Sequence, residues 1–103
     1  MDRLATLKQI LAQNPDDTFA RYGLAMEYSR AGDIDVALAE FNRLLQGKPD
    51  YIAGYHMAAQ MLASAQRTDE ARSFLERGIA AAQRAGNNHA ASEMQGFLDE
   101  ISR

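Results

Sequence analysis

The side chains best suited to chemistry in this chain are its two histidines and three pairs of carboxylates. His56 and His89 are far apart in the sequence and lack the spacing of paired metal ligands. The carboxylate pairs share one property, which is a place where a helix is expected to begin: Asp16/Asp17, Asp33/Asp35 and Asp69/Glu70. Helix capping and the helix dipole explain acidic residues at such places without general acid–base catalysis. We therefore expect no catalytic residue and no metal site.

Motifs that bind phosphate or calcium are incomplete. Gly47-Lys48 lacks both the upstream glycine and the following hydroxyl residue of a phosphate-binding loop. Residues 33–35, Asp-Ile-Asp, begin like a calcium loop, but the next two residues supply no ligand. Cysteine is absent, which excludes disulfides, thiolate metal ligands and cysteine nucleophiles. These gaps predict a protein that needs no cofactor and argue against an enzyme.

The composition is that of a small globular domain. The 103 residues are 47% apolar and 24% charged. The formal net charge is −3 and no basic block is present, so we expect neither nucleic acid nor a membrane surface as a partner. No apolar run approaches the roughly 18 residues of a membrane span, and the first residues lack the apolar stretch of a signal peptide. We therefore expect a cytoplasmic location.

Residue types favour helices and disfavour strands. The chain has 19 Ala and 10 Leu against one Val, five Ile and three Thr. Ala and Leu lose little on entering a helix, whereas β-branched residues suit pleated sheets. Breaker residues divide the chain into segments of normal helix length, with Gly32 as a helix end and with Asp33 and Thr68 as expected caps. The expected helices span residues 2–13, 17–30, 34–46, 51–65, 69–85 and 89–102.

An internal 34-residue repeat organises these helices. Pro15 and Pro49 are one such interval apart, and each is followed by Asp. Apolar positions keep the same phase at this offset, as in the pairs Leu4/Leu38, Leu7/Phe41, Ile10/Leu44, Leu11/Leu45, Ala25/Ala59, Tyr28/Leu62, Ala37/Ala71 and Phe41/Leu75. A helix pair without a repeat would show only the ordinary helical period, so the shared frame predicts stacked helical units.

The repeat resembles the tetratricopeptide repeat (TPR), a 34-residue helix–turn–helix with the pattern W-x2-L-G-x2-Y, then A-x3-F, then P. Residues 18–51 match best, with Arg21 in place of the usual Trp and these residues on the pattern: Leu24, Ala25, Tyr28, Ala37, Phe41 and Pro49. Residues 52–86 match next, through Tyr55, Ala58, Ala59, Leu62, Ala71 and Leu75. That second unit departs from the pattern at Gln66, where a glycine stood before, and at Gln83, where no proline closes it.

The resemblance implies an all-α fold, a right-handed superhelix of antiparallel helix pairs with about six helices. We expect one domain over residues 1–103. Its parts are an N-terminal helix in 1–14 that resembles half a repeat, repeats at 18–51 and 52–86, and a capping helix in 87–103. The cap follows from the apolar stripe Ala90, Ala91, Met94, Phe97, Leu98 and Ile101, which breaks the 34-residue frame.

Two helices carry a second, partly apolar stripe opposite the first one. At about 100° per residue, the stripe of the second helix is separate from the one that holds Leu24 and Ala25. In TPR proteins the first helix of each repeat lines a concave groove for a peptide or a partner helix. The resemblance therefore implies that this groove is lined by Phe19, Tyr22, Met26, Ala53, His56, Met57 and Gln60.

The groove residues indicate what is bound. Family members that bind carboxylates use a Lys/Asn/Arg clamp, whereas Tyr22, Met26 and Met57 occupy those positions here. We therefore expect apolar side chains, carried by a peptide or an amphipathic helix. The function expected is protein–protein interaction, as an adaptor or scaffold with a protein or peptide partner.

Three other interpretations stay open. The second stripe can pack against neighbouring helices instead of a partner. The chain can self-associate through its terminal helices, since the first one has apolar residues and no preceding partner helix, although the sequence does not itself indicate a homo-oligomer. A small helical enzyme is the third. The sequence also leaves open whether the last helix covers the groove.

Overall fold

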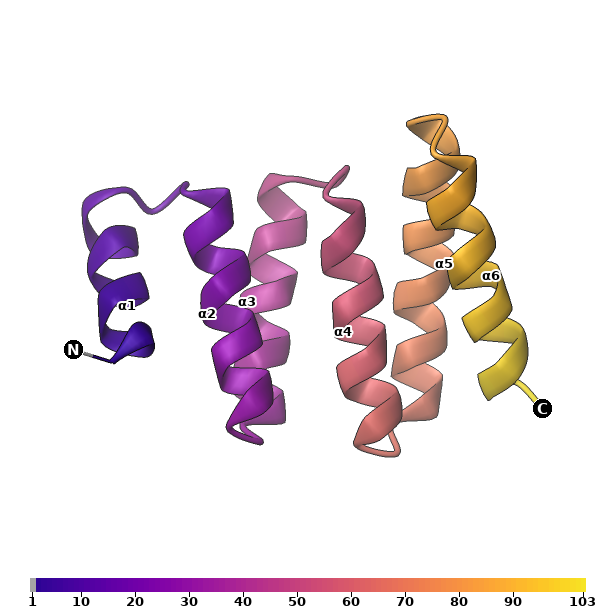
Figure 1. The fold of residues 1–103 in the computed structure, drawn as a ribbon, viewed down its shortest axis with the longest axis horizontal. Helices are drawn as coiled ribbons and strands as arrows, with labels where there is room; N and C mark the ends of the chain where they lie inside the picture. Colours follow the sequence, from indigo (N-terminus) through magenta and orange to yellow (C-terminus); the bar gives the residue numbers. More distant parts are fainter. Residues whose placement is uncertain (1) are drawn as a thin grey trace. The chain divides into compact units, whose positions relative to one another are not determined.

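A computed structural model describes residues 2–103. It contains six helices (Figure 1) with these bounds: α1 Arg3–Gln13, α2 Thr18–Arg30, α3 Ile34–Gly47, α4 Ile52–Ser64, α5 Thr68–Arg84 and α6 Asn88–Ile101. The helices expected from the sequence agree with these to within one residue at each end. The chain forms two compact units, of which the first ends at Lys48 and the second begins at Pro49. The single domain expected over 1–103 stays a prediction.

The first unit has two layers of apolar contact around α2. One layer joins α1 to α2 through a cluster of Leu7, Leu11, Ala20 and Leu24, against which Leu4 and Tyr28 pack. The other joins α2 to α3, where Ala25, Ala37 and Phe41 are fully buried. Burial of a Phe side chain contributes about 1.5–3 kcal/mol to folding. These contacts use the stripe of α2 that the 34-residue frame assigned to the core.

The second unit repeats this arrangement with α4, α5 and α6. Ala59 and Ala71, the counterparts of Ala25 and Ala37 one repeat later, are also fully buried, as are Leu62 and Leu75. The capping helix α6 packs on α5 and buries Met94 completely. These residues and those of the first unit are core positions that the repeat predicts, whereas Tyr28, the counterpart of Leu62, is only half-buried. None of the helices in residues 2–103 combines the length and apolarity needed to cross a membrane.

Helix starts follow the expected pattern only in part. Asp2, Asp17 and Asn87 each accept a hydrogen bond from the backbone N–H three residues later, at 2.7, 2.9 and 3.0 Å. Asp33 is the N-cap residue of α3 as expected, but the expected side-chain bond is absent, and the expected cap at Thr68 is wrong. Asp33 contributes its backbone carbonyl and no side-chain bond, and Thr68 is already the first residue of α5. A capping residue type shows where a helix starts, but its rotamer decides whether its side chain bonds there.

The turns after α2, α4 and α5 share one backbone conformation. Gly32 and Gly86 have φ of +83° and +70°, and Gln66 has φ of +65°. Gln66 occupies the position of Gly32 one repeat later, so the second repeat keeps the left-handed turn without the glycine that normally permits it. The same 6→1 hydrogen bonds close both turns, from Asp33 N to Tyr28 O at 3.0 Å and from Arg67 N to Leu62 O at 2.8 Å.

Gln66→Gly is expected to stabilise the protein. A left-handed residue with a Cβ costs roughly 1–2 kcal/mol, and the greater freedom of glycine in the unfolded chain offsets about half of this gain. We predict a net increase of about 0.5–1 kcal/mol in the free energy of unfolding, measured by urea denaturation. The matched change Gly32→Ala should have the opposite sign. A less stable Gln66→Gly variant would contradict this reading of the turn.

Close packing at Gly78 brings three helices of the second unit together. A Cβ built there would lie 2.6 Å from Met94 Sδ and 2.7 Å from Tyr55 Cβ, so α5 approaches both α4 and α6 at this point. Gly78→Ala should lower the free energy of unfolding by about 1–3 kcal/mol through overpacking. Gly96→Ala in α6 is the control, because nothing lies within 4 Å of its Cβ position. This control should gain up to about 1 kcal/mol from helix propensity. Equal effects of the two changes would show that α5 is not closely packed at Gly78.

Candidate functional site

The exposed face of α2 carries the first three residues expected to line a groove. Phe19 is 72% exposed, and Met26 and Tyr22 are half-buried. The Tyr22 ring packs edge-on against the buried ring of Phe41, with centroids 6.5 Å apart and planes at 74°. Ala20 and Ala25 of the first stripe are buried in the core, whereas the second stripe is exposed at Phe19 and reaches the α2–α3 layer through Tyr22. It is an apolar surface anchored in the core by Tyr22.

The corresponding face of α4 is more polar. Ala53 and Gln60 are exposed, while Met57 and His56 are half-buried. Gln60 Nε2 lies 3.4 Å from His56 Nε2, and the His56 ring is tilted against the Phe97 ring of α6 with centroids 6.2 Å apart. The capping helix therefore reaches one edge of this face without burying its other residues.

Of the seven expected residues, Phe19, Ala53 and Gln60 are exposed and the other four are half-buried. Three of the seven lie on α2 in the first unit and four on α4 in the second. Their union in a common groove stays a prediction. Sequence reasoning assigned Phe97 only to the packing stripe of α6, and its contact with His56 is new. No signal in the sequence pointed to it, because the 34-residue frame is broken in α6.

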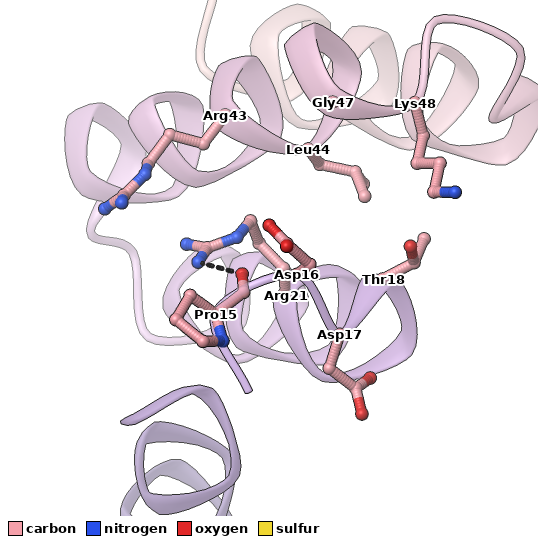
Figure 2. A pocket seen from close by; sticks show the side chains of 9 residues that line it. All are labelled: Pro15, Asp16, Asp17, Thr18, Arg21, Arg43, Leu44, Gly47 and Lys48. Atoms are coloured by element: carbon pink, nitrogen blue, oxygen red, sulfur yellow. Dashed lines mark hydrogen bonds between the residues drawn. The ribbon is translucent and has the colours of Figure 1, made fainter. Parts of the chain in front are cut away.

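A pocket of about 390 Å³ lies in the first unit, between the turn before α2 and the last turns of α3 (Figure 2). Sequence reasoning missed it. Its nine lining residues come from both segments: Pro15, Asp16, Asp17, Thr18 and Arg21 on one side, and Arg43, Leu44, Gly47 and Lys48 on the other.

Arg21 forms the inner wall of this pocket. Its side chain is only 11% exposed and donates to Glu40 Oε1 at 2.6 Å and to the Pro15 carbonyl at 2.9 Å (Figure 2 shows the second bond). Tyr55, at the same position one repeat later, donates its hydroxyl to the Pro49 carbonyl at 2.7 Å. Both repeats therefore hold the turn before their first helix by a side chain at the same position. The shared 34-residue offset was the available sequence signal for this pairing.

Acidic residues and histidines do not assemble into a metal site. Within residues 2–103, no three of them are placed to hold an ion. Among the carboxylates singled out from the sequence, Asp17 caps α2 and Asp69 pairs with Arg72 at 2.6 Å. His89 lies 3.4 Å from Glu93 on the exposed surface of α6. Each of these groups has a local structural role at or near a helix start.

Comparisons with known proteins point to the same family. A tetratricopeptide repeat family model matches residues 28–92. A TPR repeat-containing protein of Pseudomonas aeruginosa is 32% identical over 97 residues, which cover 94% of this chain and 92% of that protein.

Solved structures agree with this. The solution structure of a tetratricopeptide repeat domain protein from Salinibacter ruber has a TM-score of 0.77 at 32% identity, covering 85% of this chain and 89% of that one. The TPR2B domain of yeast Sti1, solved as a complex with pHsp70, has a TM-score of 0.85 at 15% identity, covering 96% and 79%. At that identity the second likeness is one of fold alone.

Arg21→Met tests the ion pair behind the pocket. Glu40 is only 16% exposed, so its carboxylate would be left half-buried without a partner. We expect the free energy of unfolding to fall by about 2 kcal/mol, as read from chemical denaturation. The double change Arg21→Met/Glu40→Met should recover part of this loss. The control Arg72→Met breaks a pair whose Asp69 is 95% exposed and should have little effect. Equal losses for Arg21→Met and Arg72→Met would mean that burial gives the Arg21 pair no special weight.

Proposed function

Because the chain belongs to the tetratricopeptide repeat family, a fold that generally mediates protein–protein interaction rather than catalysis, we propose that it binds a peptide or helix of a partner protein. The partner would lie on the face of α2 that carries Phe19, Tyr22 and Met26. The observation that carries this proposal is Phe19, a large apolar side chain left 72% exposed beside Tyr22 and Met26. Contiguous apolar side chains on a surface typically mark an interaction site.

The three side chains of α2 suit an apolar ligand. Tyr22 is held by its edge contact with Phe41, so a ligand meets a ring that is already ordered. Met26 is flexible and polarisable and accepts ligands of varied shape. Phe19 offers the largest area that a partner can bury, and aromatic residues commonly dominate binding energy. An amphipathic helix or an extended segment with apolar side chains matches this surface.

The face of α4, in the second unit, offers polar contacts of its own. His56 and Gln60 can donate or accept hydrogen bonds, and Ala53 leaves space for a ligand backbone. The complex of the yeast Sti1 domain with pHsp70 supports the general proposal that a domain of this fold binds a partner. The adaptor or scaffold role and the cytoplasmic location expected from the sequence stay predictions.

Self-association through α1 is the weaker alternative. Leu7 and Leu11 are buried against α2, so they are not available to a second copy. Ile10, at 39% exposure, is the large apolar residue of α1 that is most open to solvent. A single aliphatic side chain is a small surface on which to build a dimer.

Phe19→Ala together with Met26→Ala should weaken partner capture at least tenfold, since one central aromatic contact is typically worth about 2 kcal/mol. The measurement is quantitative affinity capture from the native source with wild-type and variant protein. Val36→Ala is the matched control, because Val36 is 46% exposed on α3 and outside the proposed face. Melting temperatures should stay close to wild type for both proteins. An unchanged set of captured proteins with the double variant would contradict the proposed site.

A further inference from the structure

The two repeats differ in the contacts between the start of their first helix and the second half of their second helix. We call this region the corner of each repeat. In the second unit the Arg77 guanidinium lies over the Tyr55 and Phe74 rings, with its carbon 5.3 and 4.9 Å from their centroids. This stack occupies the space beside the start of α4, and cation–π contact satisfies the arginine. The corner of the second unit is therefore closed by its own side chains.

In the first unit the same three positions, one repeat earlier, carry Arg43, Arg21 and Glu40. No ring is present at these positions for Arg43 to stack on, and Arg21 and Glu40 pair with each other at 2.6 Å. The Arg43 side chain makes no hydrogen bond or ion pair with any residue that the structure describes. The aromatic stack of the second unit is thus replaced by the open pocket of about 390 Å³.

Lys48 adds a second unpartnered cation to this pocket. It stands at the position of the fully buried Ala82 of the second unit, yet it is exposed and its side chain makes no polar contact within residues 2–103. Figure 2 shows its ammonium group on the rim, on the same side as the Thr18 hydroxyl, with Arg43 at the other end. Arg43 and Lys48 therefore border one hollow, and neither is engaged in an ion pair with the part of the chain that is described.

The two carboxylates that line the pocket form no ion pair with Arg43 or Lys48. Asp17 accepts a hydrogen bond from the Ala20 N–H at 2.9 Å, and Figure 2 shows its side chain projecting away from the hollow. Asp16 points into it, beside Arg21. Arg21 is paired with Glu40. Arg43 and Lys48 are therefore the lining cations without an ion-pair partner among residues 2–103, and Asp16 is the carboxylate that points into the hollow.

We propose that this pocket binds the carboxylate of a glutamate or aspartate side chain presented by the partner protein. The Lys48 ammonium and the Thr18 hydroxyl lie on the same side of the rim, where both can donate to one carboxylate. Arg43 adds positive charge at the other end of the hollow. Pro15 and the buried Leu44 offer apolar walls for the methylene groups of the ligand. The inference rests on the proposed function, because the carboxylate belongs to a protein partner.

The test is a titration of the ¹⁵N-labelled full chain with a short peptide that carries three glutamates and has acetylated and amidated ends. Blocked ends ensure that only side-chain carboxylates are probed. We expect saturable shifts of the Thr18, Gly47 and Lys48 amide signals, and none with the same peptide in which glutamine replaces glutamate. Inorganic phosphate is titrated in parallel, and shifts with phosphate but not with the glutamate peptide overturn the proposal.

Two kinds of variant should change the affinity for the glutamate peptide in opposite directions. The double variant Arg43→Gln/Lys48→Gln should lower the affinity for the glutamate peptide roughly tenfold or more, and Asp16→Asn should raise it. Arg84→Gln is the matched control, since it removes one exposed arginine charge from the second unit. Equal weakening by Arg84→Gln and Arg43→Gln would mean general charge attraction and would overturn the proposed pocket. Both lining cations are exposed, so a thermal melt confirms that the variants fold.

The two proposals fail separately. Peptide binding at the pocket does not require Phe19, so Phe19→Ala should leave the glutamate titration unchanged. If partner capture depends on Phe19 but the glutamate peptide never binds, the pocket proposal is wrong and the proposed function stands. If the peptide binds and partner capture ignores Phe19, the site on α2 is wrong instead.

Discussion

Close approach of paired helices through alanine is the constraint on which the rest of this structure depends. Ala25 and Ala37 in the first unit, and Ala59 and Ala71 in the second, are fully buried. A methyl side chain lets two helix backbones approach more closely than any larger residue. Because α2 and α4 bury this stripe against their neighbours, residues of their second stripe such as Phe19, Ala53 and Gln60 are left exposed. The exposure of Phe19 is therefore a consequence of how the core is built.

Most of the helices and core positions that could be predicted from the sequence were predicted from the repeat. Apolar residues recur at a fixed offset of 34 positions. Their position in this frame indicates where each helix lies and which of its residues enter the core. The offset does not determine the residue type at the turn: Gln66 adopts the left-handed conformation that its type disfavours, and the Arg67 N–H closes this turn on the Leu62 carbonyl as in the first repeat. It also does not carry contacts made outside the frame, and so the meeting of His56 with Phe97 was not foreseen.

Divergence within the repeat explains why the two units are not equivalent. Arg21 and Tyr55 both hold a proline carbonyl, so the turn before each first helix keeps the same support. Their chemistry differs, and with it the environment of the neighbouring arginine. An aromatic partner closes the corner around Arg77, whereas an ion pair leaves Arg43 open to solvent. A single repeat framework thereby produces one filled corner and one charged hollow.

The most direct measurement of the central claim is site-specific photo-crosslinking. A photoreactive phenylalanine analogue is placed at Phe19, on the outward face of α2, or at Val36, on α3, and both proteins are irradiated in extract of the native source. Binding across the α2 face predicts a discrete crosslinked protein from position 19 and none from position 36. Crosslinking from position 36 alone, or the same product from both positions, would contradict the account.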